Sequence, residues 1–334
     1  MTLNHNFAIT ADGGKLSYYT FGSGPSLLIL HGTVCFALSH RELAEALSDH
    51  FTVHLASRRG RGLSDGYPQS VLDTPIEAAN DEPPLKVGSR SYPRAYNSQF
   101  AQRVLAIEIE DLDTLVRATR AEAILGVSSG ALVTIQALLS SPASSSVTEV
   151  KRVVIFEPPL VCEDVDTPCD VAGIKQFEEE LAAGDLLNAM VTSMRVAQLG
   201  PGWIPRGVMR WLTSMMMGYQ GKQSEKKKAA GEDEGACTMK ALGPLTRYDF
   251  ALVEAMVGDS RRLEGLSQRA KLLLLSGSRT PAYLAGAMQI LGEMNPEAKR
   301  VVVEGVGHEL LCGKEMRGSP AKAVPALKSF LGVE

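Results

Sequence analysis

Six short apolar segments, each followed by a turn rich in Gly, Ser or Pro, constrain the fold of this chain most strongly. The segments span residues 26–32, 51–60, 121–130, 151–159, 271–277 and 299–305. Several are continuous rather than alternating, as in KLLLLSG at 271–277, which is typical of strands covered on both faces of a parallel sheet. Segments of helical periodicity lie between them, at 39–50, 103–120, 130–142 and 320–333. This alternation predicts a doubly wound α/β sheet, in which ligands bind beyond the carboxyl ends of the strands.

Three further segments complete the predicted architecture. An antiparallel hairpin precedes the strands, with its turn at 12–14, and a polar insert rich in Pro and Tyr covers 66–98. A longer insert of helical character covers 160–265 and contains a charged run at 221–236, which we expect to be a mobile loop. We therefore predict a core domain formed by 1–159 and 266–334, with a helical cap domain at 160–265 inserted after the sixth strand.

The bulk composition excludes several classes of protein. The 334 residues carry a net charge of −4, so electrostatics gives no reason to expect nucleic acid or an anionic membrane as partner. The N-terminus has no basic or apolar region typical of a secretory signal, and no apolar run approaches the roughly 20 residues of a membrane helix. The five scattered cysteines contain no C-x-x-C pair, which favours reduced thiols over disulfides or a zinc site. We expect a cytoplasmic protein and leave open whether it forms a homodimer.

The sequence GVSSG at 126–130 fits the pattern G-x-S-x-G between a predicted strand and a predicted helix. In that context the pattern indicates a nucleophile elbow, a strained turn that projects the Ser128 hydroxyl above the sheet. Gly126 and Gly130 then lack side chains because strand and helix backbones pass close together. The main-chain N–H of Ser129 would point at a developing oxyanion.

Two more features fit a serine nucleophile. The strand at 26–32 ends in His31-Gly32, where an oxyanion loop would begin, and the N–H of Thr33 is the natural second donor. We expect His31 itself to be structural. A serine also needs a base, and of the six histidines only His308 follows Ser128 in the chain, on a Gly-rich loop just past the last strand.

With these blocks in place, the chain resembles the α/β-hydrolase superfamily over nearly its whole length outside the two inserts. The matching blocks, in order, are DGGKLSYYTFGSGPSLLILHG, SRRGRGLSD, GVSSGAL, IFEPPL and GVGHE. The chain is most similar to a cofactor-independent serine hydrolase branch with a Ser-Ser-Gly nucleophile elbow and a Glu-Pro-Pro block after the sixth strand. The resemblance implies an α/β-hydrolase fold, the chain order nucleophile, acid, histidine, and no cofactor. The serine nucleophile argues against the branches that use Asp there, and Val127 replaces the His that often precedes the nucleophile.

The usual catalytic acid of this superfamily is missing from its expected position. It lies three residues after Gly277, where this chain has Thr280, which we expect to be an ordinary turn residue. We predict that Glu157 takes its place, because it ends the strand after the elbow and some members of the superfamily carry the acid there. The alternative for Glu157 is a structural carboxylate near the elbow. The weaker candidates for the acid are Asp249, Asp259 and Glu304.

Large apolar side chains are concentrated in the predicted cap. They are Met190, Met194, Trp203, Met209, Trp211, Met215, Met216 and Met217. Some must pack the cap onto the core, but MRWLTSMMMGY holds more of them than one packing stripe needs. We predict that Trp203, Trp211, Met215 and Met216 line the substrate site.

These observations favour a serine hydrolase that forms an acyl-enzyme and needs no cofactor or metal. The substrate would be a mid-sized hydrophobic small molecule with an ester, lactone, thioester or activated C–C bond. Two alternatives stay open. The same Ser/His site could catalyse cyclisation, condensation or elimination on a natural-product-like intermediate, or the chain could be a non-enzymatic ligand receptor on this scaffold.

Overall fold

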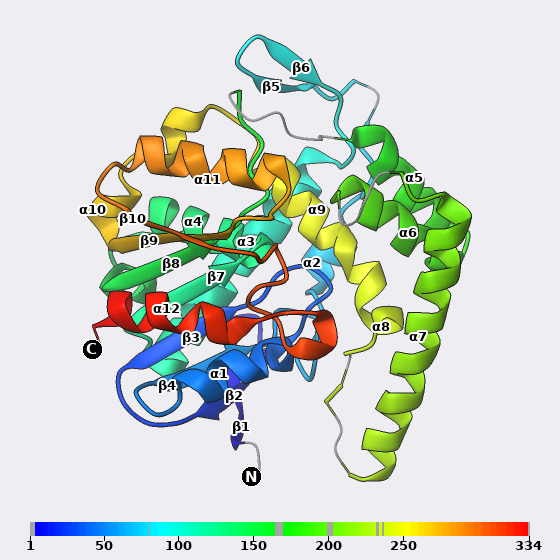
Figure 1. Ribbon diagram of the computed structural model, residues 1–334. Coiled ribbons are helices and arrows are strands. Elements are labelled where there is room, and N and C mark those ends of the chain that lie inside the picture. Colours follow the sequence, from blue (N-terminus) through cyan, green and yellow to red (C-terminus); the bar gives the residue numbers. More distant parts are fainter. Residues whose placement is uncertain are drawn as a thin grey trace.

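The computed structural model describes residues 4–79, 81–163, 170–198, 203–231, 234–235 and 237–332. Its centre is an eight-stranded sheet with the order β1-β2-β4-β3-β7-β8-β9-β10 (Figure 1). The strands are β1 (Asn4–Ile9), β2 (Lys15–Phe21), β3 (Ser26–Leu30), β4 (Thr52–Ala56), β7 (Ala123–Val127), β8 (Arg152–Phe156), β9 (Lys271–Gly277) and β10 (Lys299–Val303). β1 and β2 pair antiparallel, β2 pairs antiparallel with β4, and all later pairs are parallel. The predicted mostly parallel sheet and its six apolar strands are therefore confirmed.

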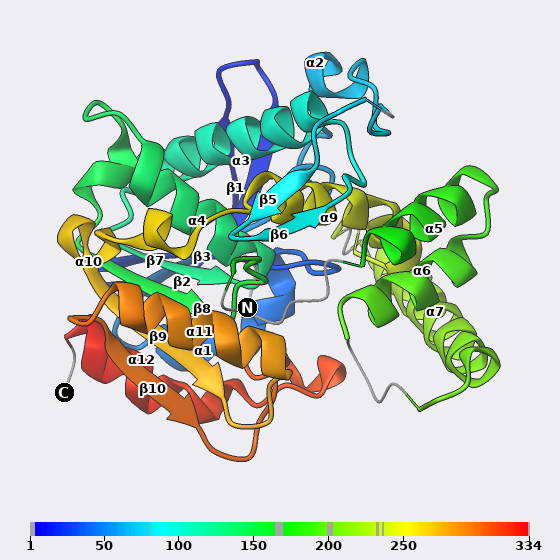
Figure 2. The same cartoon turned by 90° about the horizontal axis from the view of Figure 1, so that it is seen from above.

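The continuous apolar strands are explained by helices on both faces of the sheet. In β3, Leu27 and Ile29 belong to one buried apolar cluster, and Leu28 and Leu30 to the other. The helices α1 (Arg41–Leu47) and α12 (Val324–Leu331) contribute to the first cluster. The second contains residues of α3 (Ser98–Thr119), α4 (Ser129–Ser140) and α11 (Ala282–Met294). Figure 2 shows α3 and α4 on one side of the sheet and α12 on the other. Full burial of each leucine contributes about 1.5–3 kcal/mol, so no position in such a strand favours a polar residue.

The long insert is mostly helical. Its helices are α5 (Val171–Ala182), α6 (Leu186–Val196), α7 (Arg206–Ala229), α8 (Met239–Leu242) and α9 (Thr246–Ala255). In Figure 1, α5, α6 and α7 stand beside the sheet at the right, while α9 lies between them and the core. α9 packs against both α3 and α4. The division at residues 160 and 265 stays a prediction, but α9 is in close contact with the core.

The prediction of a mobile loop at 221–236 is wrong for residues 221–229, because α7 continues through Ala229. Lys, Gln, Glu and Ala are strong helix formers, and Lys226, Lys227 and Lys228 in the last turn complement the helix dipole. Lys227 also forms an ion pair of 2.8 Å with Glu234. Residues 232, 233 and 236 lie outside the described residues.

The other elements are short. They are α2 (Gln69–Leu72), β5 (Leu85–Val87), β6 (Arg90–Tyr92), α10 (Leu266–Arg269) and 3₁₀ turns at Ala37–His40, Ser146–Glu149, Gly243–Leu245, Ser260–Leu263, Lys314–Met316 and Pro320–Lys322. β5 and β6 form a separate antiparallel hairpin within the polar insert. Of the helices in the described part of the chain, none is long and apolar enough to cross a membrane.

Candidate active site

Ser128 occupies a sharp turn between β7 and α4. Its φ of 53° and ψ of −120° lie in a region that side-chain-bearing residues rarely adopt, which is the strain expected at a nucleophile elbow. A Cβ on Gly126 would lie 2.8 Å from Ala131 Cα, and one on Gly130 would lie 2.5 Å from the Leu30 carbonyl oxygen. Both glycines are therefore required by close backbone contacts, for the reason that the motif suggested.

His308 follows β10 on a loop that returns to the carboxyl end of β7. Its Nε2 lies 3.1 Å from Ser128 Oγ, within hydrogen-bond distance. The imidazole stacks on the ring of Phe156, with 5.8 Å between centroids and 15° between planes. Its side chain remains 20% exposed. The ring is thus fixed in orientation and stays partly exposed.

Glu157 lies directly after β8 in a left-handed conformation, with φ of 46°. Its Oε2 is 2.6 Å from His308 Nδ1, on the ring edge away from Ser128. The carboxylate is completely buried, and its Oε1 accepts a hydrogen bond of 2.7 Å from the N–H of Gly277. Such charge-assisted hydrogen bonds make a buried carboxylate tolerable. Because Glu157 binds Nδ1, the Nε2 atom is oriented toward the serine hydroxyl.

Thr280 is not the ordinary turn residue that we expected. Its hydroxyl donates a 2.6 Å hydrogen bond to Glu157 Oε2, the same oxygen that contacts His308. The side chain at the position expected for the acid therefore contacts the carboxylate that we predict to replace it. No local pattern predicts this contact, because it joins residues 123 positions apart.

The other carboxylates considered for the acid do not contact the imidazole in the described part of the chain. Asp249 is buried against two arginines, at 2.7 Å from each. Asp259 has a side chain that is 49% exposed and pairs with Arg261. Glu304 is exposed. Glu157 is the carboxylate that the fold brings to His308.

The two proposed oxyanion donors, Thr33 and Ser129, lie on adjacent segments. Ser129 begins α4 and is buried, and Thr33 follows β3, so both meet at the carboxyl ends of neighbouring strands. Thr33 Oγ1 donates a 3.3 Å hydrogen bond to Ser129 Oγ. Neither main-chain N–H donates a hydrogen bond to another described residue. The start of a helix also carries partial positive charge, which suits an anion.

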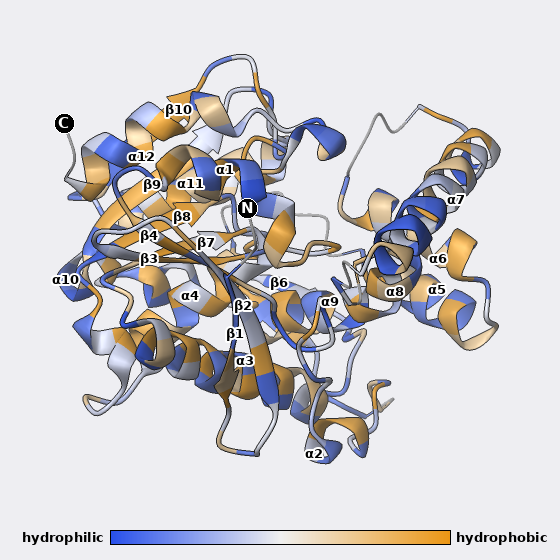
Figure 3. Ribbon diagram, turned by 90° about the horizontal axis from the view of Figure 1, so that it is seen from below, coloured by the Kyte–Doolittle hydropathy of each residue, from blue (hydrophilic) through white to orange (hydrophobic). Residues whose placement is uncertain are grey.

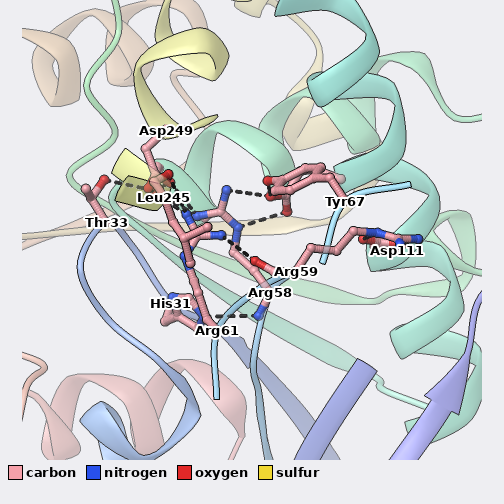
Figure 4. A network of polar contacts seen from close by, with 12 residues as sticks. His31, Thr33, Arg58, Arg59, Arg61, Tyr67, Asp111, Leu245 and Asp249 are labelled. Carbon is pink, nitrogen blue, oxygen red and sulfur yellow. Dashed lines mark hydrogen bonds and ion pairs between the residues drawn. The ribbon is translucent and has the colours of Figure 1, made fainter. Parts of the chain in front are cut away.

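A buried ionic network contacts the side chain of Ser129 (Figure 4). The sequence did not predict this network. Arg58 binds both oxygens of Glu108 at 2.8 Å and Asp249 Oδ1 at 2.7 Å. Arg61 binds Asp249 Oδ2 at 2.7 Å, and all four side chains are buried. Burial opposes ionisation of Asp249, yet the guanidinium groups of Arg61 and Arg58 hold the pKa of Asp249 below its ordinary value. The block SRRGRGLSD contains both arginines, but nothing local pairs Arg58 with a residue 191 positions away.

His31 has a structural place in this network. Its Nε2 accepts a 3.1 Å hydrogen bond from the N–H of Arg58, so Nδ1 carries the proton and donates to the Gly32 carbonyl oxygen at 2.8 Å. Burial, with the positive charges of Arg61 and Arg58, lowers the pKa of His31 well below its ordinary value. A neutral His31 thus holds the loop that carries Thr33.

The predicted substrate-lining residues are exposed. Trp203, Trp211, Met215 and Met216 have exposed fractions of 82%, 60%, 57% and 42%. Figure 3 shows apolar and polar residues mixed along α7. Met190 of α6, by contrast, is buried and lies next to Gly243, which also belongs to the insert. The substrate-binding role of the four exposed residues stays a prediction.

The cysteine side chains are also potential nucleophiles and metal ligands. Cys35, Cys237 and Cys312 are free thiols, Cys162 is buried, and Cys169 lies outside the described residues. In the described ranges, no three His, Cys, Asp or Glu side chains gather closely enough to hold a metal ion.

Comparison with known proteins relates this chain to a family. The family model described as alpha/beta hydrolase family matches residues 27–313. An alpha/beta hydrolase from Sphaerobacter thermophilus DSM 20745 aligns with a TM-score of 0.66 and 23% identity, over 98% of this chain and 100% of the other. The esterase RhEst1 from Rhodococcus sp. ECU1013 aligns with a TM-score of 0.57 and 17% identity, over 98% of each chain. The esterase EaEST from Exiguobacterium antarcticum aligns with a TM-score of 0.57 and 14% identity, over 97% and 99%. The structural similarities establish a shared fold, and the family match shows that the chain belongs to the alpha/beta hydrolase family.

Proposed function

We propose that this chain is a serine hydrolase that acts through an acyl-enzyme. The observation that carries this proposal is the continuous line of hydrogen bonds from Ser128 through His308 to Glu157, at 3.1 and 2.6 Å. The proposed substrate is a mid-sized hydrophobic small molecule with an ester, lactone, thioester or activated C–C bond. We also assign the chain to the cofactor-independent branch with a Ser-Ser-Gly elbow and a Glu-Pro-Pro block, on the residues 128–130 and 157–159.

In the proposed reaction, Ser128 Oγ attacks the substrate carbonyl while His308 Nε2 takes the hydroxyl proton. Glu157 stabilises the imidazolium that forms. The N–H groups of Thr33 and Ser129 donate to the oxyanion of the tetrahedral intermediate. His308 then protonates the leaving group, and a water molecule, activated by the same base, releases the acyl group from Ser128.

The similar structures support this reaction class. Besides the two esterases, a thioesterase domain from the curacin biosynthetic pathway aligns with a TM-score of 0.55 and 16% identity, over 98% of this chain and 99% of the other. Esterases and thioesterases both transfer an acyl group. The shared fold therefore supports acyl transfer as the reaction class that we propose for this chain.

The proposal is tested with p-nitrophenyl esters of graded chain length and a fluorophosphonate probe. We expect ester hydrolysis and covalent labelling of Ser128. Lack of both would instead favour a ligand receptor on this scaffold. The mass of the product from a candidate natural substrate separates hydrolysis, which adds water, from cyclisation or elimination, which does not.

His308→Ala is expected to remove nearly all esterase activity, because no other described imidazole contacts Ser128. The measurement is kcat/KM for p-nitrophenyl ester hydrolysis by the variant and by the wild type. Rapid acylation of the His308→Ala variant at neutral pH would exclude His308 as the base.

Trp211→Ala and Met216→Ala are expected to raise KM for long-chain esters by several-fold and for short-chain esters very little. The reason is that removing about 50 Å² of apolar contact costs roughly 1 kcal/mol of binding. Leu72→Ala, which removes an exposed apolar side chain of α2, serves as the control and should change neither value. Equal effects on both chain lengths would mean that Trp211 and Met216 do not bind the acyl chain.

The cytoplasmic location and the lack of nucleic-acid and membrane partners stay predictions, and the question of a homodimer stays open. Light scattering of the purified chain measures the oligomeric state directly.

A further inference from the structure

The side chain of Ser129 connects its own helix, α4, to three other segments of the chain. Its hydroxyl donates to Asp249 Oδ1 at 2.8 Å and accepts from Arg58 Nη1 at 3.0 Å. It also accepts from Thr33 Oγ1 at 3.3 Å. A hydroxyl offers one donor and two acceptor positions, so all of its hydrogen-bonding capacity is used. Ser129 is therefore fixed both in rotamer and in the direction of its proton.

We propose that Asp249 of α9 is a positioning residue for the oxyanion hole. It holds Ser129 directly and, through the Ser129 hydroxyl, Thr33. These are the two residues whose main-chain N–H groups are the proposed oxyanion donors, so the network sets the position of one donor relative to the other. The inference rests on the proposed function, because it concerns the same site and reaction.

The carboxylate of Asp249 is itself held rigidly. Arg58 binds its Oδ1 and Arg61 binds its Oδ2, both at 2.7 Å. Arg58 is anchored on its other side by the two oxygens of Glu108, at 2.8 Å each. A carboxylate held at both oxygens cannot turn, so the hydrogen bond that it accepts from Ser129 has a fixed direction.

Asp249 also links the long insert to the site. It lies on α9, within 160–265, and is 120 positions from Ser129 in the chain. A shift of α9 relative to α4 would change the Asp249–Ser129 contact and with it the position of the oxyanion donors. Loss of a whole oxyanion donor costs about 10²- to 10³-fold in kcat, so a misplaced donor should cost roughly 10- to 100-fold.

The experiment compares Ser129→Ala and Asp249→Asn with two matched controls. Ser140→Ala is the control for Ser129→Ala and removes a hydroxyl at the exposed end of α4. Asp259→Asn is the control for Asp249→Asn and replaces an exposed aspartate of the insert. Active sites are counted with a fluorophosphonate, and kcat and KM are measured per labelled site. The affinity of a trifluoromethyl ketone, which adds to Ser128 and forms an oxyanion, is measured in parallel.

For Ser129→Ala and Asp249→Asn we expect kcat to fall by roughly 10- to 100-fold, with KM changed less than about threefold. Ketone affinity should fall by the same factor as kcat, because only the tetrahedral adduct uses the oxyanion donors. The pH dependence of kcat/KM should keep its shape, since the contacts of His308 are untouched. The double variant Ser129→Ala with Asp249→Asn should be no slower than the slower single variant.

A merely structural role predicts a different pattern. The variants would lose thermal stability or labelled sites, but kcat per site and ketone affinity would match the two controls, and the inference would be wrong. Asp249→Asn weakens the pairing of two buried arginines, so this variant could fail to fold. In that case the kinetics of Ser129→Ala and Thr33→Val test the positioning role of Asp249. Normal labelling with control-like kinetics in both overturns only this inference. No labelling of the wild-type Ser128 overturns the proposed function as well.

Discussion

Ser128→Ala is expected to lower kcat by about 10⁴-fold or more, which is the scale of loss when the nucleophile of a serine triad is removed. The substitution removes the atom that would attack the substrate and leaves His308, Glu157 and both oxyanion donors in place. The residual rate should then come from binding and the oxyanion hole alone. The measurement is kcat for p-nitrophenyl ester hydrolysis, at substrate concentrations well above KM.

The fold should survive this substitution. The only side-chain partner described for the Ser128 hydroxyl is His308, and alanine keeps a Cβ in the same strained conformation. We therefore expect the thermal midpoint to change by no more than a few degrees. Ser140→Ala, on the exposed end of α4, controls for loss of a hydroxyl and should leave kcat unchanged. If Ser128→Ala retained more than a tenth of wild-type kcat, Ser128 would not be the nucleophile.

Glu157→Gln is expected to lower kcat by about 10⁴-fold, the cost of replacing the triad acid by its amide elsewhere. The amide is close in shape to the carboxylate but carries no charge, so it cannot stabilise the imidazolium formed during acylation. Its NH₂ group also competes for His308 Nδ1 and favours the wrong tautomer. Pre-steady-state acylation kinetics measure this effect directly, because proton transfer from Ser128 occurs in that step.

Thr280→Val separates the acid from the residue that supports it. The variant loses one buried hydrogen bond to the Glu157 carboxylate but keeps the charge, so we expect a loss of about tenfold. Thr280→Asp in the Glu157→Gln background should restore part of the rate, because position 280 already contacts the atom that binds His308. If Glu157→Gln were folded and fully active, the site would work as a Ser/His dyad, since no other described carboxylate contacts His308.

Local patterns predicted most of the fold and part of the site. The strands could be found because burial on both faces makes their residues continuously apolar, as in 271–277. Ser128 can be proposed as the nucleophile because its motif lies between a strand and a helix, and His308 as the base because it is the only histidine after that motif. Glu157 was chosen because parallel strands end at one edge of the sheet, and its 2.6 Å contact with His308 agrees with that choice.

The two polar contacts that the sequence did not predict share a physical cause. The contact of Thr280 with Glu157 and that of Arg58 with Asp249 each join residues more than a hundred positions apart. Such pairing is set by side-chain geometry in the folded core, and hydrophobic periodicity does not encode it. The helical stretch 221–229 was misassigned for a different reason. Its high charge favours a solvated loop, but its residues are good helix formers, and helix propensity decides the structure.

Peptide mapping by mass spectrometry after fluorophosphonate labelling tests the central claim most directly, because it locates the reactive hydroxyl without assuming a substrate. We predict one adduct, on the peptide that contains Ser128, forming rapidly in the wild type, far more slowly in His308→Ala and Glu157→Gln, and not at all in Ser128→Ala. An adduct on another residue, or an unlabelled wild type that still hydrolyses esters, would contradict the assignment of Ser128, His308 and Glu157 as a catalytic triad.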